Sequence, residues 1–274
     1  MRRLMNQHPG RGSTLALGVL PFILIVAVYL LASSVRLAHN PNDKLLPSVS
    51  SFTQAIHEFA IEPSRRTGEI MLWADTSSSL VRLALGLGIS ALAGLVFGIV
   101  TGVIPYLRAS LAPLIAALSM IPPLAILPIL FIVFGLGELS KVVLIVFGIG
   151  PFIMRDLAMR VEELPQEQLI KAQTLGASTW QLILRVVGPQ MLPRLIDSVR
   201  LSLGPAWLFL IAAEAIAATD GLGYRIFLVR RYLAMDTILP YVVWITLLAF
   251  AMDYALRLLS RQFFPWYQTG GHKS

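Results

Sequence analysis

The sequence predicts an all-α integral membrane protein with about six transmembrane helices. Of its 274 residues, 56% are hydrophobic and 14% charged, whereas soluble domains carry about a quarter charged residues. The charges also separate long apolar runs, several of them longer than the roughly 20 residues that cross a bilayer. There is no cysteine and the four histidines are scattered, so we expect no thiolate chemistry and no metal site. The net charge of +7 lacks the basic and aromatic clusters typical of nucleic-acid binding, so we expect no nucleic-acid partner.

The membrane spans are predicted from apolar runs bounded by charges. They are expected at 12–35, 83–107, 109–137, 142–154, 201–219 and 237–256. We interpret the first as an uncleaved helix, because its apolar run exceeds the roughly 7–15 residues of a secretory signal. The fourth is short, so Lys141 and Arg155 at its ends are expected to extend to the two membrane interfaces.

The orientation follows from the distribution of basic residues. Lys and Arg concentrate on 1–13, at Arg108, on 155–200 and on 257–274. The positive-inside rule predicts that these segments, and both termini, are cytoplasmic. The expected organisation is an N-terminal membrane helix with an extracytoplasmic loop (1–75), a membrane core (76–265) and a cytoplasmic tail (266–274).

The second span carries small residues at every fourth position. They are Gly86, Ser90, Gly94, Gly98 and Gly102. Small side chains at this spacing form a groove along one face of a helix, where a neighbouring helix can approach closely. We interpret this stripe as a packing surface.

The third span contains Pro122, Pro123 and Pro128. Each internal proline removes a helix hydrogen bond, and inside a membrane the freed carbonyls must face protein or a water-filled cavity. Broken helices of this kind often mark transport pathways, which favours a pathway here. The alternative is a simple kink against neighbouring helices.

Glu214 is the acidic residue inside the fifth span. Charges there usually face the interior of a helix bundle. Three roles are open: a structural pair with a basic residue, an outer gate near Gly221 and Gly223, or proton coupling. Asp253, near the end of the last span, is expected to pair with Arg257 at i+4.

The longest cytoplasmic segment predicts a helix, a glycine turn and a second helix. Pro165 suits a first helical position and Glu167 the positive end of the helix dipole. Gly176 suits a left-handed C-terminal cap, and Ser178 with Gln181 suits a capping box that opens the second helix.

Gly188, Pro189 and Pro193 are expected to end that second helix and lead back to the membrane. A short amphipathic helix on a rigid corner suits contact with a partner protein. The alternative is an interfacial helix that contacts only lipid.

The same segment reads KAQTLGASTWQLILRVVGPQMLPRL and resembles the EAA loop of permeases of binding-protein-dependent ATP-binding-cassette importers. The residues assigned to the coupling loop by this resemblance are Ala172, Gly176, Ala177, Pro189 and Pro193. The motif glutamate falls on Ile170, with Lys171 following, so its contact with the ATPase must be replaced or absent. The resemblance implies that 162–194 couples the permease to an ATPase.

Three further stretches look like the nitrate, sulfonate, taurine and bicarbonate branch of these permeases. They are 79–102, 121–141 and 213–226, and the resemblance covers roughly 79–265. It implies a MetI-like permease core in a bacterial inner membrane. It also implies three kinds of partner: two ATPase subunits, an extracytoplasmic solute-binding protein and a second permease copy, with a homodimer expected.

The chain itself has no G-x-x-x-x-G-K-[ST] phosphate loop, so we expect no cofactor in it and ATP with Mg on the partner subunit. Two other classes compete with the permease. A secondary transporter predicts inverted repeats and further buried ionisable groups, and an intramembrane enzyme needs a nucleophile or metal constellation. The outer Arg225, Arg230 and Arg231 suit docking of an acidic partner or attraction of an anion. The solute is expected to be a small polar or ionic nitrogen or sulfur compound.

Overall fold

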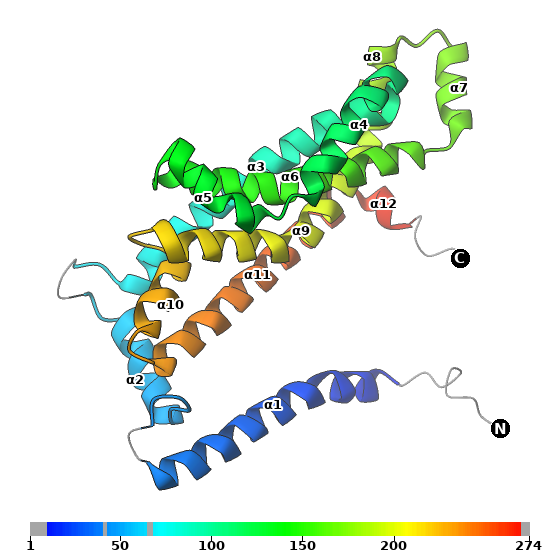
Figure 1. Cartoon of the computed structure of the whole chain (residues 1–274). Helices are drawn as coiled ribbons and strands as arrows, with labels where there is room; N and C mark the ends of the chain where they lie inside the picture. Colours follow the sequence, from blue (N-terminus) through cyan, green and yellow to red (C-terminus); the bar gives the residue numbers. More distant parts are fainter. Residues whose placement is uncertain (1–9, 41–42, 65–67, 270–274) are drawn as a thin grey trace.

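The computed structural model describes residues 10–40, 43–64 and 68–269, and the described chain is helical without strands (Figure 1). The predicted basic N-terminal segment and cytoplasmic tail therefore lie partly outside the described residues. The long helices are α1 (Arg11–His39), α3 (Met71–Val103), α6 (Glu138–Glu162), α9 (Gly188–Ala217) and α11 (Met235–Phe263). The shorter ones are α2 (Val49–Ala60), α4 (Pro105–Met120), α5 (Pro123–Phe134), α7 (Gln166–Thr174), α8 (Thr179–Leu182), α10 (Leu222–Arg230) and α12 (Pro265–Thr269).

The number of spans agrees with the expectation. In the described chain, five helical segments are long and apolar enough to cross a membrane, and six spans result if the bent pair α4–α5 counts as one. The observed helices extend beyond the apolar runs at several ends. In α3 the extension includes Asp75 and Arg82, and in α6 it includes Glu138 and Lys141, because these charges have partners inside the bundle.

The core of the bundle is the contact between α3 and α6. The glycines of the small-residue stripe face β-branched and leucine side chains of α6: Gly86 faces Ile145, Gly94 faces Ile153, Gly98 faces Leu157 and Gly102 faces Val161. A Cβ atom added to Gly94 would lie 2.4 Å from Cγ2 of Ile153. The stripe therefore lets the two helices approach more closely than any larger residue would permit, as the spacing predicted.

The third predicted span is broken. Helices α4 and α5 meet at an angle of 96°, with Ile121 and Pro122 between them. Pro122 and Pro123 have no backbone N–H to continue the hydrogen bonds of α4, so the helix must end there. Pro128 lies within α5, which ends at Gly135 with a φ of 75°. The structure thus confirms a broken helix; its role as a pathway remains a prediction.

The second helix of the loop does not end at Gly188, Pro189 and Pro193, contrary to the expectation. From Thr179 the chain stays helical to Ala217, through α8, a π-helical turn η2 (Ile183–Val187) and α9. Pro189 cannot donate to the carbonyl four residues earlier, and the wider turn accommodates this by a bond from Gly188 N–H to the carbonyl of Ile183. Pro189 is thus accommodated by a single wider, π-helical turn, and the helix continues.

Helix α1 stands apart from the bundle (Figure 1). The apolar window of its candidate span is 0% buried within the chain. Its C-terminal half is tied to the loop before α2 by hydrogen bonds. The Tyr29 hydroxyl donates to the carbonyl of Pro47 (2.8 Å), and the Ser33 hydroxyl lies within hydrogen-bond distance of the carbonyls of Leu46 (3.0 Å) and Pro47 (3.2 Å). The remaining helices form the membrane core without it.

Candidate functional site

A line of polar residues follows one face of the first turns of α3. Ser78 and Ser79 each lie three or four residues from Asp75 and from Arg82, which places the four side chains on the same side of a helix. Asp75, Ser79 and Arg82 are buried, with 1%, 0% and 4% of their surface exposed. Burial of charged groups requires partners, and these come from four other helices.

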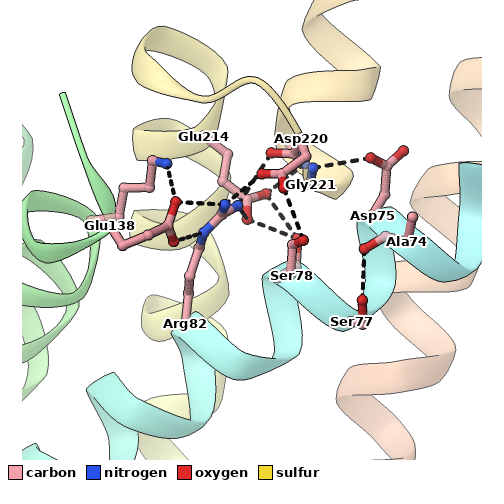
Figure 2. A network of polar contacts seen from close by, with 12 residues as sticks. Ala74, Asp75, Ser77, Ser78, Arg82, Glu138, Glu214, Asp220 and Gly221 are labelled. Carbon is pink, nitrogen blue, oxygen red and sulfur yellow. Dashed lines mark hydrogen bonds and ion pairs between the residues drawn. The ribbon is translucent and has the colours of Figure 1, made fainter. Parts of the chain in front are cut away.

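Arg82 is the centre of the first cluster (Figure 2). Its guanidinium contacts three carboxylates: Glu138 of α6 through Nε and Nη2, Glu214 of α9 through Nη1 at 2.8 Å, and Asp220 of the α9–α10 loop through Nη2. Lys141 adds a second cation on Glu138, with Nζ 2.8 Å from Oε1. The cluster joins α3, α6 and α9 at one end of the bundle.

Lys141 therefore does not extend to the membrane interface, contrary to the expectation. Its side chain is 3% exposed and paired with Glu138. The carboxylate is available because α6 begins at Glu138, directly after the Gly135–Gly137 turn that follows α5. The turn thus connects the broken helix to the polar cluster.

Glu214 is completely buried and fully satisfied. Besides Arg82, it accepts hydrogen bonds from the Ser79 hydroxyl at 2.8 and 3.0 Å and from the backbone N–H of Gly223 at 2.8 Å. The structural pair expected from the sequence is present, and the expected proximity to Gly221 and Gly223 is present as well. A gating role for Glu214 remains a prediction.

Asp75 is the centre of the second cluster. It accepts hydrogen bonds from the N–H of Gly221 (3.0 Å), from Nε of Arg225 (2.8 Å) and from the hydroxyl of Tyr241 (3.2 Å). Arg225 is therefore engaged inside the protein rather than free for a partner or an anion, which corrects the expectation for that residue. Asp75 thereby connects α3 to α10 and α11.

The loop between α9 and α10 fits closely around these carboxylates. Gly221 has a φ of 108°, and a Cβ atom there would lie 2.6 Å from Cδ of Glu214 and 2.8 Å from Nη1 of Arg82. A Cβ at Gly223 would lie 2.7 Å from the carbonyl oxygen of Ile211. Both glycines are required for the backbone N–H groups to reach the acidic side chains.

Asp220 is the partly exposed carboxylate of this loop. Partial burial raises the pKa of its carboxyl, but the hydrogen bonds and charge of Arg82 outweigh that effect, and the net pKa lies below the ordinary value. Ser78 also donates to it, at 3.1 Å. Asp220 and Glu138, with 48% and 63% of their side chains exposed, carry the surface charge of the network.

The loop 162–194 lies at the opposite end of the bundle. Helix α7 begins at Gln166, one residue later than expected, and Pro165 is its N-cap. Gly176 has a φ of +82°, and Ser178 and Gln181 form both hydrogen bonds of the capping box. The helix, glycine turn and second helix predicted from the sequence are thus confirmed.

Large apolar side chains of this loop face outward. The exposed residues are Ile170 (55%), Leu175 (88%), Trp180 (68%) and Leu184 (69%). On the inner side, Leu169 and Ala172 pack against the hydrophobic core. An apolar patch of this kind on a polar loop indicates a surface for a partner protein or lipid.

The loop is also connected to the bundle behind it. Gln190 of α9 donates to the side chain of Gln168 at 3.2 Å, and Arg194 contacts Glu163 at 3.2 Å. Ala177 N–H closes the turn on the carbonyl of Ala172 at 3.0 Å. Pro193 is buried on α9, beside this anchoring. Helix α7 is thus connected to α9 through Gln168 and Gln190, and the end of α6 is connected to α9 through Glu163 and Arg194.

The structure brings Glu214, Gly221 and Gly223 into one site. The prolines of the broken helix and the residues expected to form the coupling loop lie elsewhere. Sequence reasoning missed Arg82, Asp75, Ser79, Glu138 and Asp220, and treated Arg82 as the boundary of a span. The sequence did contain an indication of this site. Asp75, Ser79 and Arg82 are polar residues on one helical face, directly before the apolar run 83–107.

Residues 94–265 match the family described as "Binding-protein-dependent transport system inner membrane component". The chain belongs to this family. It is a permease subunit of the ATP-binding-cassette importers, and permease subunits of this family are not themselves enzymes. The resemblance seen in the sequence is thereby confirmed.

Two relatives and one solved structure illustrate the similarity. The taurine transport system permease protein TauC of Escherichia coli is 40% identical over 72% of this chain and 71% of its own. The nitrate import permease protein NrtB of Synechococcus elongatus is 29% identical over 76% and 75%. An inward-facing structure of the MetNI methionine ABC transporter covers 70% of this chain and 95% of its own, with a TM-score of 0.62 and 20% identity, and shares the permease fold.

Proposed function

We propose that this permease works as a pair, driven by two ATPase subunits that bind the loop 162–194 and supplied with solute by an extracytoplasmic binding protein. ATP and Mg are held by the ATPase subunits. In this arrangement the loop end of the bundle faces the cytoplasm and the Arg82 cluster faces the opposite side of a bacterial inner membrane. The distribution of Lys and Arg supports this orientation.

The observation that carries the proposal is the geometry of the loop. It presents exposed apolar residues on the short helix α7 (Ile170), at the glycine corner (Leu175) and on the helix that follows (Trp180 and Leu184). Gln168 of α7 is hydrogen-bonded to Gln190, which anchors α7 to α9. A lipid-bound helix would need no such anchoring, whereas a helix that transmits force does.

The transmission follows from the continuous helix behind the loop. The helical segment Thr179–Ala217 begins at the loop and carries Glu214 near its other end. Movement of the loop therefore reaches the Arg82 cluster without crossing a flexible joint in that segment. We infer alternating access: the nucleotide-binding dimer closes, moves the loop and opens the far side to the binding protein, and hydrolysis reverses the movement.

The pathway is assigned to the face that carries the broken helix. Pro122, Pro123 and Pro128 shape the break, and the turn after α5 leads directly to Glu138 and the gate candidates Glu214, Gly221 and Gly223. The solute is proposed to be a small anion or zwitterion of the kind named for the relatives, taurine or nitrate.

The test is transport by the reconstituted complex. The permease is co-expressed with candidate ATPase and binding-protein subunits, purified in mild detergent and placed in proteoliposomes. The proposal expects an ATPase subunit in about 1:1 ratio and ATP-dependent uptake of a binding-protein-delivered solute. Recovery of the permease alone after cross-linking, or uptake that needs no ATP, would contradict it.

A further inference from the structure

Arg155 lies on the membrane-spanning helix α6 without a carboxylate partner. Its side chain is exposed, and its contact within the described chain is a hydrogen bond from Nη1 to the Ser119 hydroxyl, at 2.8 Å. By contrast, Arg82, Arg108 and Arg200 each contact at least one carboxylate. A charge without a counter-ion in a transmembrane helix almost always faces a water-filled cavity or another protein.

The position of Arg155 on α6 also indicates that its charge needs a polar environment inside the protein. The apolar run 142–154 extends only about 20 Å as a helix, at about 1.5 Å per residue, against a hydrocarbon core of about 30 Å. Lys141, at the other end of the run, is buried against Glu138. Arg155 does not extend toward the nearer end of α6; it contacts Ser119, next to the break between α4 and α5. Its charge therefore lies close to the C-terminal end of α4, beside the helix break.

Arg155 borders a cavity of about 240 Å³ between α3, α4 and α6. Arg108 and Glu162 line the cavity as well and pair with each other, with Nη1 3.0 Å from Oε1. The charge of Glu162 is thus balanced by Arg108, and the charge of Arg155 leaves the cavity positive by one unit. At about 30 Å³ of liquid volume per water molecule, the cavity has room for a small ion with some of its water.

The donors suit an oxyanion. Ser119 donates its hydroxyl hydrogen to the carbonyl of Ala116 at 2.7 Å, so its oxygen acts as the acceptor for Arg155 and holds the guanidinium in place. A guanidinium has five N–H groups in a planar fork that matches two oxygens of one anion. A single bond to Ser119 leaves most of that fork available.

We propose that Arg155 binds a small oxyanion, such as a sulfonate or nitrate, in this cavity during its passage through the permease. Ser119 positions the guanidinium, and the Arg108–Glu162 pair lines the same cavity where it meets the loop 162–194. The site lies between the helix break and the loop 162–194. In this proposal the anion binds there before it is released from the permease. The inference rests on the proposed import function for the identity of the anion as cargo, whereas the binding of the anion can be tested without transport.

The binding test uses the purified permease–ATPase complex and sodium methanesulfonate as the probe, with sodium gluconate at equal ionic strength as the reference. We expect methanesulfonate to raise the midpoint of thermal unfolding of the wild-type permease by about 2–4 °C. Arg155→Gln should abolish this rise, and Arg155→Lys should retain part of it. Arg261→Gln is the matched control, because Arg261 is exposed on α11 and has no ion pair within the described chain. An equal rise in Arg155→Gln and wild type would overturn the proposal.

Two further results would also overturn it. In nanodiscs, anionic lipid could raise the midpoint of thermal unfolding while methanesulfonate does not raise it in purely zwitterionic lipid. That result would assign Arg155 to a lipid phosphate. A loss of the permease pair in Arg155→Gln, measured by the mass of the complex and without any anion effect in the wild type, would assign Arg155 to the contact between copies.

The transport test uses proteoliposomes that contain the complex. Arg155→Gln is expected to lower uptake of an anionic sulfonate about tenfold while ATPase stimulation by the loaded binding protein persists. Equal losses of uptake and of ATPase stimulation would indicate a structural defect and overturn the assignment. Failure of wild-type uptake would instead count against the proposed function, and the unfolding test would still decide whether the anion binds.

Discussion

Arg82 of α3 and Glu214 of α9 form a buried ion pair, with 2.8 Å between Nη1 and Oε1 and with 4% and 0% of their side chains exposed. The pair joins residues 132 positions apart in the sequence. It closes the bundle at the end opposite to the loop 162–194, and its two side chains also hold the α9–α10 loop through Asp220 and the start of α10 through Gly223.

Glu214→Gln should strongly destabilise the permease. The change leaves the charge of Arg82 with fewer counter-charges in a buried site, and removal of one partner from such a pair costs about 3–5 kcal/mol. Thermal unfolding in detergent measures the effect. The control is Asp253→Asn, which removes a partly exposed partner of Arg200 and Arg257 and should cost about 1 kcal/mol or less. Similar losses in the two variants would show that the buried pair contributes little.

Gly221→Ala should destabilise the permease by more than Gly135→Ala. Both glycines have positive φ values, 108° and 75°, but only at Gly221 would the new Cβ meet Glu214 and Arg82. The backbone strain alone is about 1–2 kcal/mol, and the clash adds to it. Chemical or thermal unfolding of the two variants separates strain from clash. Equal effects would mean that the α9–α10 loop can move away from Glu214.

Gly94→Ala should destabilise the contact between α3 and α6 by about 1–3 kcal/mol, because the added methyl group would lie 2.4 Å from Ile153. Gly88, on the same helix, has nothing within 4 Å of a Cβ position. Gly88→Ala should therefore be neutral, or stabilising by about 0.5–1 kcal/mol, since alanine favours helix. Unfolding midpoints of the pair test this, and a tolerant Gly94 would contradict the close approach of the helices.

Gly176→Val should uncouple transport from ATP hydrolysis. The φ of +82° costs a β-branched residue at least about 1–2 kcal/mol, while open space around the position excludes a steric clash as the cause. Gly176→Asn is the control, because asparagine tolerates the left-handed conformation. ATPase activity and uptake are measured in proteoliposomes. If both survive in Gly176→Val, the assignment of the coupling loop is wrong.

Ile170→Glu should weaken the contact with the ATPase. This change places a glutamate at the motif position, but Ile170 is 55% exposed among the apolar residues of the loop, so the partner surface is expected to be apolar there. Ile170→Leu should have little effect. Co-purification of the ATPase subunit measures the difference. Tighter association of the Ile170→Glu variant would show that the partner retains a basic site for the motif glutamate.

Local features of the fold were predicted well because each depends on residues within one or two helical turns. The capping box at Ser178, the left-handed Gly176 and the small-residue stripe of α3 are of this kind. The pairing of Asp253 with Arg257 at i+4 is confirmed too, with an additional partner in Arg200. The interruption at Pro122 and Pro123 follows from the missing N–H groups alone.

Other features depended on the surroundings. Proline at 189 and 193 was expected to end a helix, but packing of α9 in the bundle and the π-helical turn preserve it. Lys141 was expected to reach the interface, but the carboxylate of Glu138 lies within 2.8 Å of it. The neighbouring sequence is compatible with a helix that ends at these prolines or continues through them, and with a Lys141 that reaches the interface or pairs inside the bundle. The sequence therefore did not distinguish these alternatives.

The sequence by itself determined the class of the protein, the approximate spans, the helix–glycine–helix loop and the membership in a permease family. Apolar runs, caps and motif spacing are properties of neighbouring residues, and they persist in any arrangement of the helices. Only the tertiary structure decided that Arg82 joins Glu138, Glu214 and Asp220, and that Arg155 borders a cavity without contacting a carboxylate itself. Buried charges are stabilised by partners from distant segments, and the packing of α3 against α6 and α9 determines which partners they meet.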